Sequence, residues 1–378
     1  MFAVDVCRLP ETGGSTFVLV AGLLLLVAGV VVTRWVRRSA GRLSVVAAPL
    51  VLLSVLAVGP AVVDPCAPAT TTTTTTTLAP VELTFTSRTT ADGLGEGYVF
   101  GVFVDGSTVY VATAGGLSIS TDGGATFTNR TTADGLGDNS VVGGVVAVGS
   151  TVYAATYGGL SISTDGGATF TNRTTADGLG DILVSGVYVV GSTVYVATPG
   201  GLSISTDGGA TFTNRTEADG LRSVGVQGVV AVGSTVYAAT GDGLSISTDG
   251  GVTFTNRTTA DGLGDNSVVG GVFVDGSTVY AGTVGGLSIS TDGGATFTNR
   301  TVANGLGSAE LPIITSVFGQ GRTVYATTLL GLGVSTDGGA TFTTRTTEHG
   351  LAANAAFRVN VFGSKVYVST DVGLSISN

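Results

Sequence analysis

Six aspartates recur along the chain in one sequence context, Ser-Thr-Asp-Gly-Gly followed by a small residue, Thr and Phe. A carboxylate at the head of such a turn can accept hydrogen bonds from the backbone N–H groups two and three residues further on. Its other chemistry would be calcium binding, but Ca²⁺ takes about 6–8 oxygen ligands and each turn offers one carboxylate. The pattern predicts a structural role, and no metal site, for Asp122, Asp165, Asp207, Asp249, Asp292 and Asp337.

The composition offers few candidates for catalytic residues. The 378 residues include one His, one Met and one Trp, and both cysteines precede residue 67, which excludes thiol catalysis from the rest of the chain. Seven arginines recur with the same period as the aspartates, so their side chains are not expected to converge on one ligand. No pair of acidic residues is placed by the sequence at the separation that glycoside hydrolysis needs. We therefore expect no enzymatic activity, no catalytic residue and no cofactor.

The period of these motifs defines the elements that must position them. The Phe that closes each motif, such as Phe127 and Phe170, recurs at intervals close to 42 residues, which indicates stacked supersecondary units. Within one unit, four β-type runs are separated by Gly-rich turns, for example GGVVAV, STVYAAT, GLSIS and ATFTNRT. No stretch after residue 83 has a sustained helical period. Four strands in about 42 residues are typical of one blade of a β-propeller.

The strand count predicts how the ring closes. Seven strands of the GLSIS type and seven of the TFT type are present. The first TFT strand, at Thr84, precedes every GLSIS strand, and the last GLSIS strand, at Gly373, ends the chain. Pairing these two strands would remove an open sheet edge. Residues 84–378 are therefore predicted to form an all-β domain, a seven-bladed β-propeller closed by its N-terminal strand.

Residues that differ between repeats are the candidates for binding, because near-identical positions only build the blade. They fall in the turn between the second and third strands and in the connection to the next blade. We expect both kinds of loop on one face, around the mouth of a central channel. Their chemistry suits a sugar or a peptide, although drift in loops would explain the same variation. The candidates are Glu96, Tyr98, Tyr157, Asp181, Arg222, Asp242, Glu310, His349 and Asp371.

Two family resemblances accompany this pattern. The segment from Ser120 to Phe127 resembles the Asp-box of BNR repeats, S-x-D-x-G-x-T-W/F, and residues 260–288 resemble the blade of two-component regulator propellers. Sialidases carry Asp-boxes, so the resemblance also implies a glycoside hydrolase of sialidase-like propeller type as an alternative. The Arg triad of that family is not matched, because only Arg222, Arg322 and Arg358 depart from the repeat and no Arg-Ile-Pro precedes them. A structural scaffold with no specific ligand is the remaining alternative.

The N-terminus contains a different motif. Leu9, Pro10, Glu11, Thr12 and Gly13 are followed by an apolar run and an Arg-rich patch, which resembles the sortase sorting signal of Gram-positive bacteria. That signal normally lies at the C-terminus, whereas only eight residues precede it here. A relic or gene fusion is one interpretation, and processing by a sortase is another. A disulfide between Cys7 and Cys66 would retain the peptide after such a cut.

Two apolar runs, Phe17–Thr33 and Leu43–Val63, are each long enough to cross a bilayer, and the Arg-rich segment between them predicts a cytoplasmic loop. Residues 15–63 are therefore predicted to form a two-helix transmembrane hairpin, with residues 1–14 extracytoplasmic. The alternative is a cleaved signal peptide that begins at Arg34. Residues 64–83 are a Thr/Pro-rich linker in either case. Both interpretations export everything after residue 70.

The charge distribution restricts the partners. Residues 81–378 carry eleven basic and twenty-three acidic side chains, a net charge of −12 that would repel a phosphate backbone. We expect no nucleic-acid partner. The sequence predicts a membrane-tethered propeller at the cell surface that binds an extracellular carbohydrate or protein without transforming it.

Overall fold

The structure is a computed structural model that describes residues 83–308 and 312–378. The chain divides into two compact units, Met1–Ala79 and Pro80–Asn378. The sortase-like motif, the predicted membrane segments, both cysteines and nearly all of the linker lie outside the described residues, as does Glu310. Within the described ranges, no helix is long and apolar enough to cross a bilayer.

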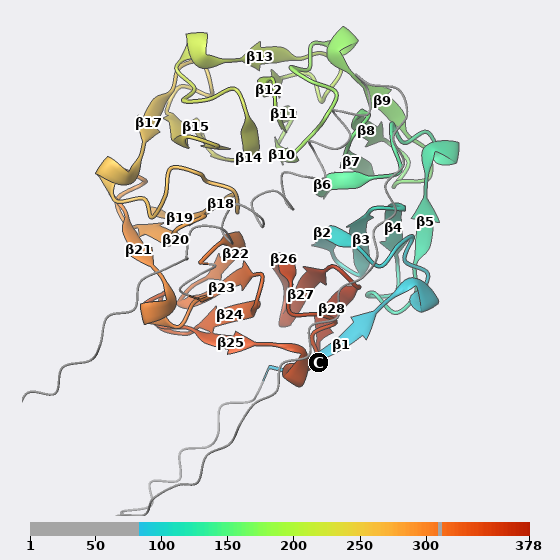
Figure 1. Cartoon of the computed structure of the whole chain (residues 1–378). Coiled ribbons are helices and arrows are strands. Elements are labelled where there is room, and N and C mark those ends of the chain that lie inside the picture. The colour runs from blue at the N-terminus through green and yellow to red at the C-terminus, as the bar shows by residue number, and fades with distance from the viewer. Residues whose placement is uncertain (1–82, 309–311) are drawn as a thin grey trace, which may run out of the picture. The chain divides into compact units, whose positions relative to one another are not determined.

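Seven four-stranded antiparallel sheets are arranged as a ring (Figure 1). In six of them the chain runs from the innermost strand to the outermost strand in sequence order. Each innermost strand contacts the innermost strands of both neighbouring sheets, and the ring closes where β2 meets β26. The seven-bladed propeller predicted from the repeats is therefore confirmed for the described residues.

The strands occupy equivalent positions in every blade. The innermost strands are β2 (Val99–Asp105), β6 (Val141–Val148), β10 (Gly186–Val190), β14 (Val226–Val232), β18 (Val272–Asp275), β22 (Ile314–Gln320) and β26 (Ala356–Phe362). The second strands are β3 (Thr108–Thr113), β7 (Thr151–Thr156), β11 (Thr193–Thr198), β15 (Thr235–Thr240), β19 (Thr278–Thr283), β23 (Thr323–Thr328) and β27 (Lys365–Thr370). The third strands are β4 (Gly116–Ser120), β8 (Gly159–Ser163), β12 (Gly201–Ser205), β16 (Gly243–Ser247), β20 (Gly286–Ser290), β24 (Gly331–Ser335) and β28 (Leu374–Ser377). The outermost strands are β5 (Thr128–Arg130), β9 (Thr171–Arg173), β13 (Thr213–Arg215), β17 (Thr255–Arg257), β21 (Thr298–Arg300), β25 (Thr343–Arg345) and β1 (Phe85–Arg88).

A short 3-10 helix follows each outermost strand, which the sequence patterns did not predict because three residues are too few to produce a helical period. Thr89 begins the first one as a capping box, and its backbone N–H donates to the Asp92 carboxylate at 2.8 Å. Gly93 ends it with φ 97°, where an added Cβ would clash with the Phe127 carbonyl oxygen. The helices are η1 (Thr90–Asp92), η2 (Thr132–Asp134), η3 (Thr175–Asp177), η4 (Glu217–Asp219), η5 (Thr259–Asp261), η6 (Val302–Asn304) and η7 (Thr347–His349).

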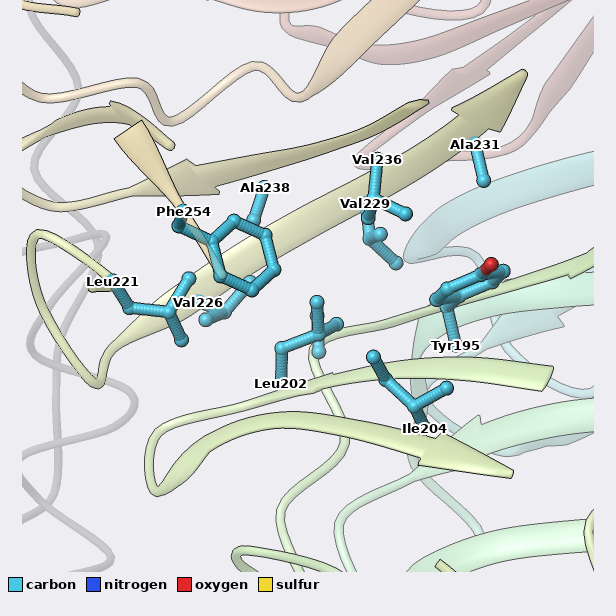
Figure 2. Packing of buried hydrophobic residues seen from close by; sticks show 11 residues of the cluster. Tyr195, Leu202, Ile204, Leu221, Val226, Val229, Ala231, Val236, Ala238 and Phe254 are labelled. Atoms are coloured by element: carbon cyan, nitrogen blue, oxygen red, sulfur yellow. The ribbon is translucent and has the colours of Figure 1, made fainter. Parts of the chain in front are cut away.

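The hydrophobic core is divided into clusters that lie between neighbouring blades. Figure 2 shows one of them, in which Tyr195, Leu202 and Ile204 of the third blade face Val229 and Phe254 of the fourth. Leu202 is fully buried and Phe254 is 8% exposed. Each blade thus contributes one of its two faces to each of two clusters, so no blade has a complete core without its neighbours.

The N-terminal strand closes the ring as predicted. β1 pairs antiparallel with β28, with Phe85 opposite Ser377. Asn378 reinforces the junction, because its backbone N–H donates to the Thr84 carbonyl at 3.0 Å and its amide oxygen accepts from the Thr86 hydroxyl at 2.7 Å. Phe85 is 6% exposed and packs in a cluster with Leu332 of the sixth blade. The last blade therefore consists of both ends of the propeller sequence.

Repeated arginines join the blades at the periphery. The Nε of Arg88 donates to the Gly124 carbonyl of the next blade at 2.8 Å, and four further blades make the same contact. Arg215 and Arg345 are the exceptions, and their Nε atoms are buried with no partner among the described residues. For Arg345 the reason is structural, since the next blade joins β28 to β1 by strand pairing and has no Asp-box to offer a carbonyl.

Candidate functional site

The Asp-box turns lie between the third and fourth strands of six blades. In the turn of Asp292, one carboxylate oxygen accepts from the Ala295 N–H at 2.9 Å, the Thr296 N–H at 3.0 Å and the Ser290 hydroxyl at 2.6 Å. The other oxygen accepts from the Thr296 hydroxyl at 2.6 Å. The donors are three and four residues after the aspartate, and the expectation of two and three was wrong. The Gly294 N–H, two residues after the aspartate, donates to the Ser290 hydroxyl instead, so the donors to the aspartate lie one residue further along the chain.

These hydrogen bonds also change the acidity of the turn. Donation from Ser290 and Thr296 lowers the pKa of the Asp292 carboxyl well below its usual range, and the other five boxes behave alike. Both carboxylate oxygens already accept from protein donors, which is the arrangement of a turn and not that of a cation site. Within the described residues, no group of three or more His, Cys, Asp or Glu side chains could hold a metal ion.

The two kinds of variable loop meet at the opposite end of the blade from the Asp-boxes. The Ala114 N–H, in the turn between β3 and β4, donates to the Tyr98 carbonyl at 3.1 Å in the connection that enters the same blade. The Ser140 hydroxyl, in the connection entering the next blade, donates to the Ala114 carbonyl at 3.4 Å. At the other end, the Gly123 N–H of the box donates to the Ser107 carbonyl. The variable loops therefore share one face, which we call the loop face.

Tyr98 lies at the centre of the best-defined group on the loop face. Its ring is stacked on Phe357 at 5.1 Å between centroids and is tilted against Phe100 at 4.8 Å. Burial raises the pKa of the Tyr98 hydroxyl, and the neighbouring Asp371 and Tyr157 raise it further. These five residues, the Tyr98 cluster, come from the first, second and seventh blades. Tyr98 remains 38% exposed, so an aromatic surface is open beside a carboxylate.

Sequence reasoning missed two members of this cluster. Phe100 and Phe357 are inside the innermost strands β2 and β26, where positions were expected only to build the blade. Their equivalents in the fourth and sixth blades are Gln227 and Thr315, as the matching strand registers show. A comparison of the repeats strand by strand would have shown that aromatic residues occupy this position in two adjacent blades.

Of the other candidates, Glu96, Asp181, Arg222 and Asp242 lie in loops of this face, whereas His349 lies in the 3-10 helix η7, beside the start of β1. Arg222 donates from Nε to the Asp242 carboxylate at 2.9 Å, and both side chains are nearly half exposed, so the pair contributes little to stability. The Asp181 carboxylate accepts from the Leu183 N–H at 2.8 Å and shapes its own loop. His349 takes the place of the capping aspartate in η7, and its Nδ1 accepts from the Thr346 N–H at 3.1 Å. Glu96 is exposed in the connection that contains Tyr98.

Comparisons with known proteins extend only to the fold. No protein family and no curated protein sequence matches the chain. Among solved structures, the extracellular domain of a putative hybrid two-component system from B. thetaiotaomicron has 16% identity and a TM-score of 0.65, over 78% of this chain and 42% of that one. YCF48 from Cyanidioschyzon merolae has 17% identity and a TM-score of 0.58, over 78% and 98%. The GH74 enzyme of Niastella koreensis has 23% identity and a TM-score of 0.52, over 75% and 43%.

These proteins share the propeller fold and differ in what they do. One is an extracellular domain and another is an enzyme. A further matching structure, YCF48 bound to D1 peptide, has 16% identity and a TM-score of 0.57, over 74% of this chain and 93% of that one. The described chain spans about two fifths of the first of these structures. The likeness confirms the propeller resemblance predicted from the repeats, while the function has to be argued from this chain's own residues.

Proposed function

We propose that the propeller is a binding module whose loop face receives a segment of an extracellular protein at the Tyr98 cluster. The observation that carries this proposal is the cluster itself, in which stacked aromatic rings stand next to the Asp371 carboxylate at the junction of two blades. Aromatic rings bind apolar side chains, and a carboxylate accepts backbone N–H donors. The structure of YCF48 with a bound peptide supports the same use of the fold.

A carbohydrate is the second candidate ligand, because sugars also stack on exposed aromatic rings and donate hydroxyls to carboxylates. Glycoside hydrolysis is the alternative suggested by the fold of the GH74 enzyme. Against hydrolysis of the sialidase type, which uses an Arg triad, five of the seven repeated arginines donate to carbonyls of the neighbouring Asp-box and lie at the periphery of the ring. A screen of the full-length chain with chromogenic glycosides separates hydrolysis from binding, since turnover would contradict the binding proposal.

Replacement of both Tyr98 and Tyr157 with Ala is expected to weaken peptide binding by roughly tenfold or more, because two aromatic anchors of the loop face are removed. The measurement is binding of the full-length chain, purified in mild detergent, to a peptide array and to a glycan array. The melting temperature should change little, because Tyr98 is 38% exposed and Tyr157 is in a surface turn.

Phe362→Ala is the matched control, since Phe362 is 43% exposed and ends β26 at the opposite end from Phe357 of the Tyr98 cluster. It should leave binding unchanged. Binding that survives the double substitution but is lost in Phe362→Ala would place the ligand on the opposite face. Binding to glycans alone would replace the peptide by a carbohydrate.

We also propose that the propeller is displayed outside the cell and tethered through residues 15–63, with sortase as a further partner if the LPETG motif is processed. A membrane-impermeant thiol reagent applied to intact, reduced cells should label both Cys7 and Cys66, because a hairpin places both on the outer side. The measurement is mass spectrometry of the labelled peptides. Labelling of neither cysteine, in a mature chain whose N-terminus lies near Thr70, would establish the cleaved signal peptide instead, because cleavage there removes both cysteines.

A further inference from the structure

One position on the innermost strands breaks the repeat in a single blade. Six blades carry a small residue there, and the seventh carries Arg358. The register confirms the equivalence, because Gly101, Gly228 and Arg358 each face the same position of the second strand. The small residues are Gly101, Gly144, Gly186, Gly228, Gly271 and Ser316.

The innermost strands approach closely at this level. A Cβ added to Gly101 would lie 3.3 Å from the Gly144 Cα, and one added to Gly228 would lie 3.5 Å from the Gly271 Cα. The Arg358 side chain extends over Gly101, since the same added Cβ would lie 3.3 Å from the arginine Cδ and 3.7 Å from its Nε. The glycine backbone therefore leaves the space that a long cationic side chain occupies.

A β-bulge aims this side chain at the first blade. The register of β26 against β27 shifts between Ala356 and Arg358, so that Phe357 and Arg358 both reach residues of the first blade. Hydrogen bonds fix the bulge, because Thr327 donates to the Phe357 carbonyl at 3.3 Å and the Arg358 N–H donates to the Ser369 hydroxyl at 2.9 Å. Arg358 and its neighbour Phe357, a member of the Tyr98 cluster, therefore both contact the first blade.

The guanidinium has no counter-ion among the residues that the structure describes. Its side chain makes no hydrogen bond or ion pair to any of the described residues, and it is only partly open to solvent. Desolvation lowers the pKa of this group, as expected for a charge that is partly withdrawn from water. A part-buried charge without a partner is unfavourable, and the other blades avoid it with Gly or Ser. Departures of this kind from a repeat occur at functional sites.

We propose that Arg358 binds the C-terminal carboxylate of a peptide whose last side chain packs on the Tyr98 cluster. This assignment rests on the proposed function and names the ligand group that it needs. A single guanidinium suits one carboxylate, which it can bind through two parallel N–H donors. Asp371 and the net charge of −12 on residues 81–378 disfavour a polyanion and suit a ligand that has one negative group and several N–H donors.

The test uses a peptide array anchored through the peptide N-termini and printed twice, once with free carboxylates and once with C-terminal amides. The full-length chain should prefer the free carboxylates by roughly 10- to 100-fold, the range expected for hydrogen bonds to a charged group. Arg358→Gly should abolish that preference. The variant should fold, because Gly is the residue of five other blades at this position. Arg358→Lys should keep part of the preference, since it retains the charge but not the bidentate geometry.

Arg322→Ser is the matched control. It removes one positive charge from an exposed turn after β22 and restores the Ser that other repeats carry there, so it should leave the preference unchanged. Equal binding of carboxylates and amides, or a preference that survives Arg358→Gly, would overturn the inference. If Tyr98-dependent binding persists in that outcome, the proposed function stands without it. Binding of D-glucuronate, but of neither peptide set, in an Arg358-dependent manner would assign the carboxylate to a sugar.

Discussion

Deletion of residues 83–88 is expected to lower the melting temperature of the propeller more than any single substitution. The deletion removes β1, exposes the edge of β28 and takes Phe85 out of the cluster between the sixth and seventh blades. Loss of a buried Phe alone costs about 3–5 kcal/mol, against a total of about 5–15 kcal/mol for an ordinary domain. At roughly 2–4 °C per kcal/mol, a fall of roughly 6–20 °C follows from Phe85 before the strand pairing is counted. Circular dichroism of the purified chain measures it.

Two variants make this result specific to ring closure. Removing six residues from the Thr run at residues 70–77 shortens the chain equally and should leave the melting temperature unchanged. Phe85→Ala should be as destabilising as Phe127→Ala, the same position in a blade formed by continuous chain, because the two rings are 6% and 9% exposed. A deletion variant that melts with the intact protein would contradict closure by β1.

The fold was predictable because each repeat encodes one blade. The Phe and GLSIS positions determined the phase, and the unmatched strands at Thr84 and Gly373 determined the closure. The strand boundaries were predicted less accurately, since the outermost strand of the first blade, β5, begins at Thr128 and not at Thr126. Phe127 donates its N–H to the Asp92 carbonyl of the preceding 3-10 helix, so it cannot join the ladder. Contacts between blades of this kind have no local sequence signal.

The candidate site was predictable only where it is formed by loops. Variation among repeats identified Tyr98, Tyr157 and Asp371, which the structure brings together. It did not make Phe357 or Arg358 a binding candidate, although Arg358 departs from the repeat, because strand residues were expected to serve packing alone. A β-bulge re-aims both side chains, and bulges are visible only in the strand register. The sequence also gave no indication that Arg222 and Asp242 pair with each other on the fourth blade.

The Asp-boxes are expected to make the propeller acid-labile as a group. In the folded state each of the six aspartates has a lowered pKa, whereas in the unfolded chain it would titrate near about 3.9. As the pH falls below about 4, the unfolded state therefore binds protons that the folded state does not. The stabilisation is complete above that pH and is lost progressively below it. Melting temperatures between about pH 6 and pH 2 should fall steeply, with up to roughly six protons taken up on unfolding.

Asp292→Asn separates this linkage from other acid effects. The amide retains an oxygen that accepts from the Ala295 and Thr296 N–H groups, so the turn should survive. Because the amide does not titrate, this position no longer takes up a proton on unfolding. Proton uptake in the acid range should decrease by roughly one. Asp292→Ala removes the acceptor as well, and it should lower the melting temperature at neutral pH more than Asn does. Asp371→Asn is the control, because it changes a carboxylate of the Tyr98 cluster on the loop face and leaves all six boxes intact. An acid slope unchanged by Asp292→Asn would mean that the boxes do not control acid stability.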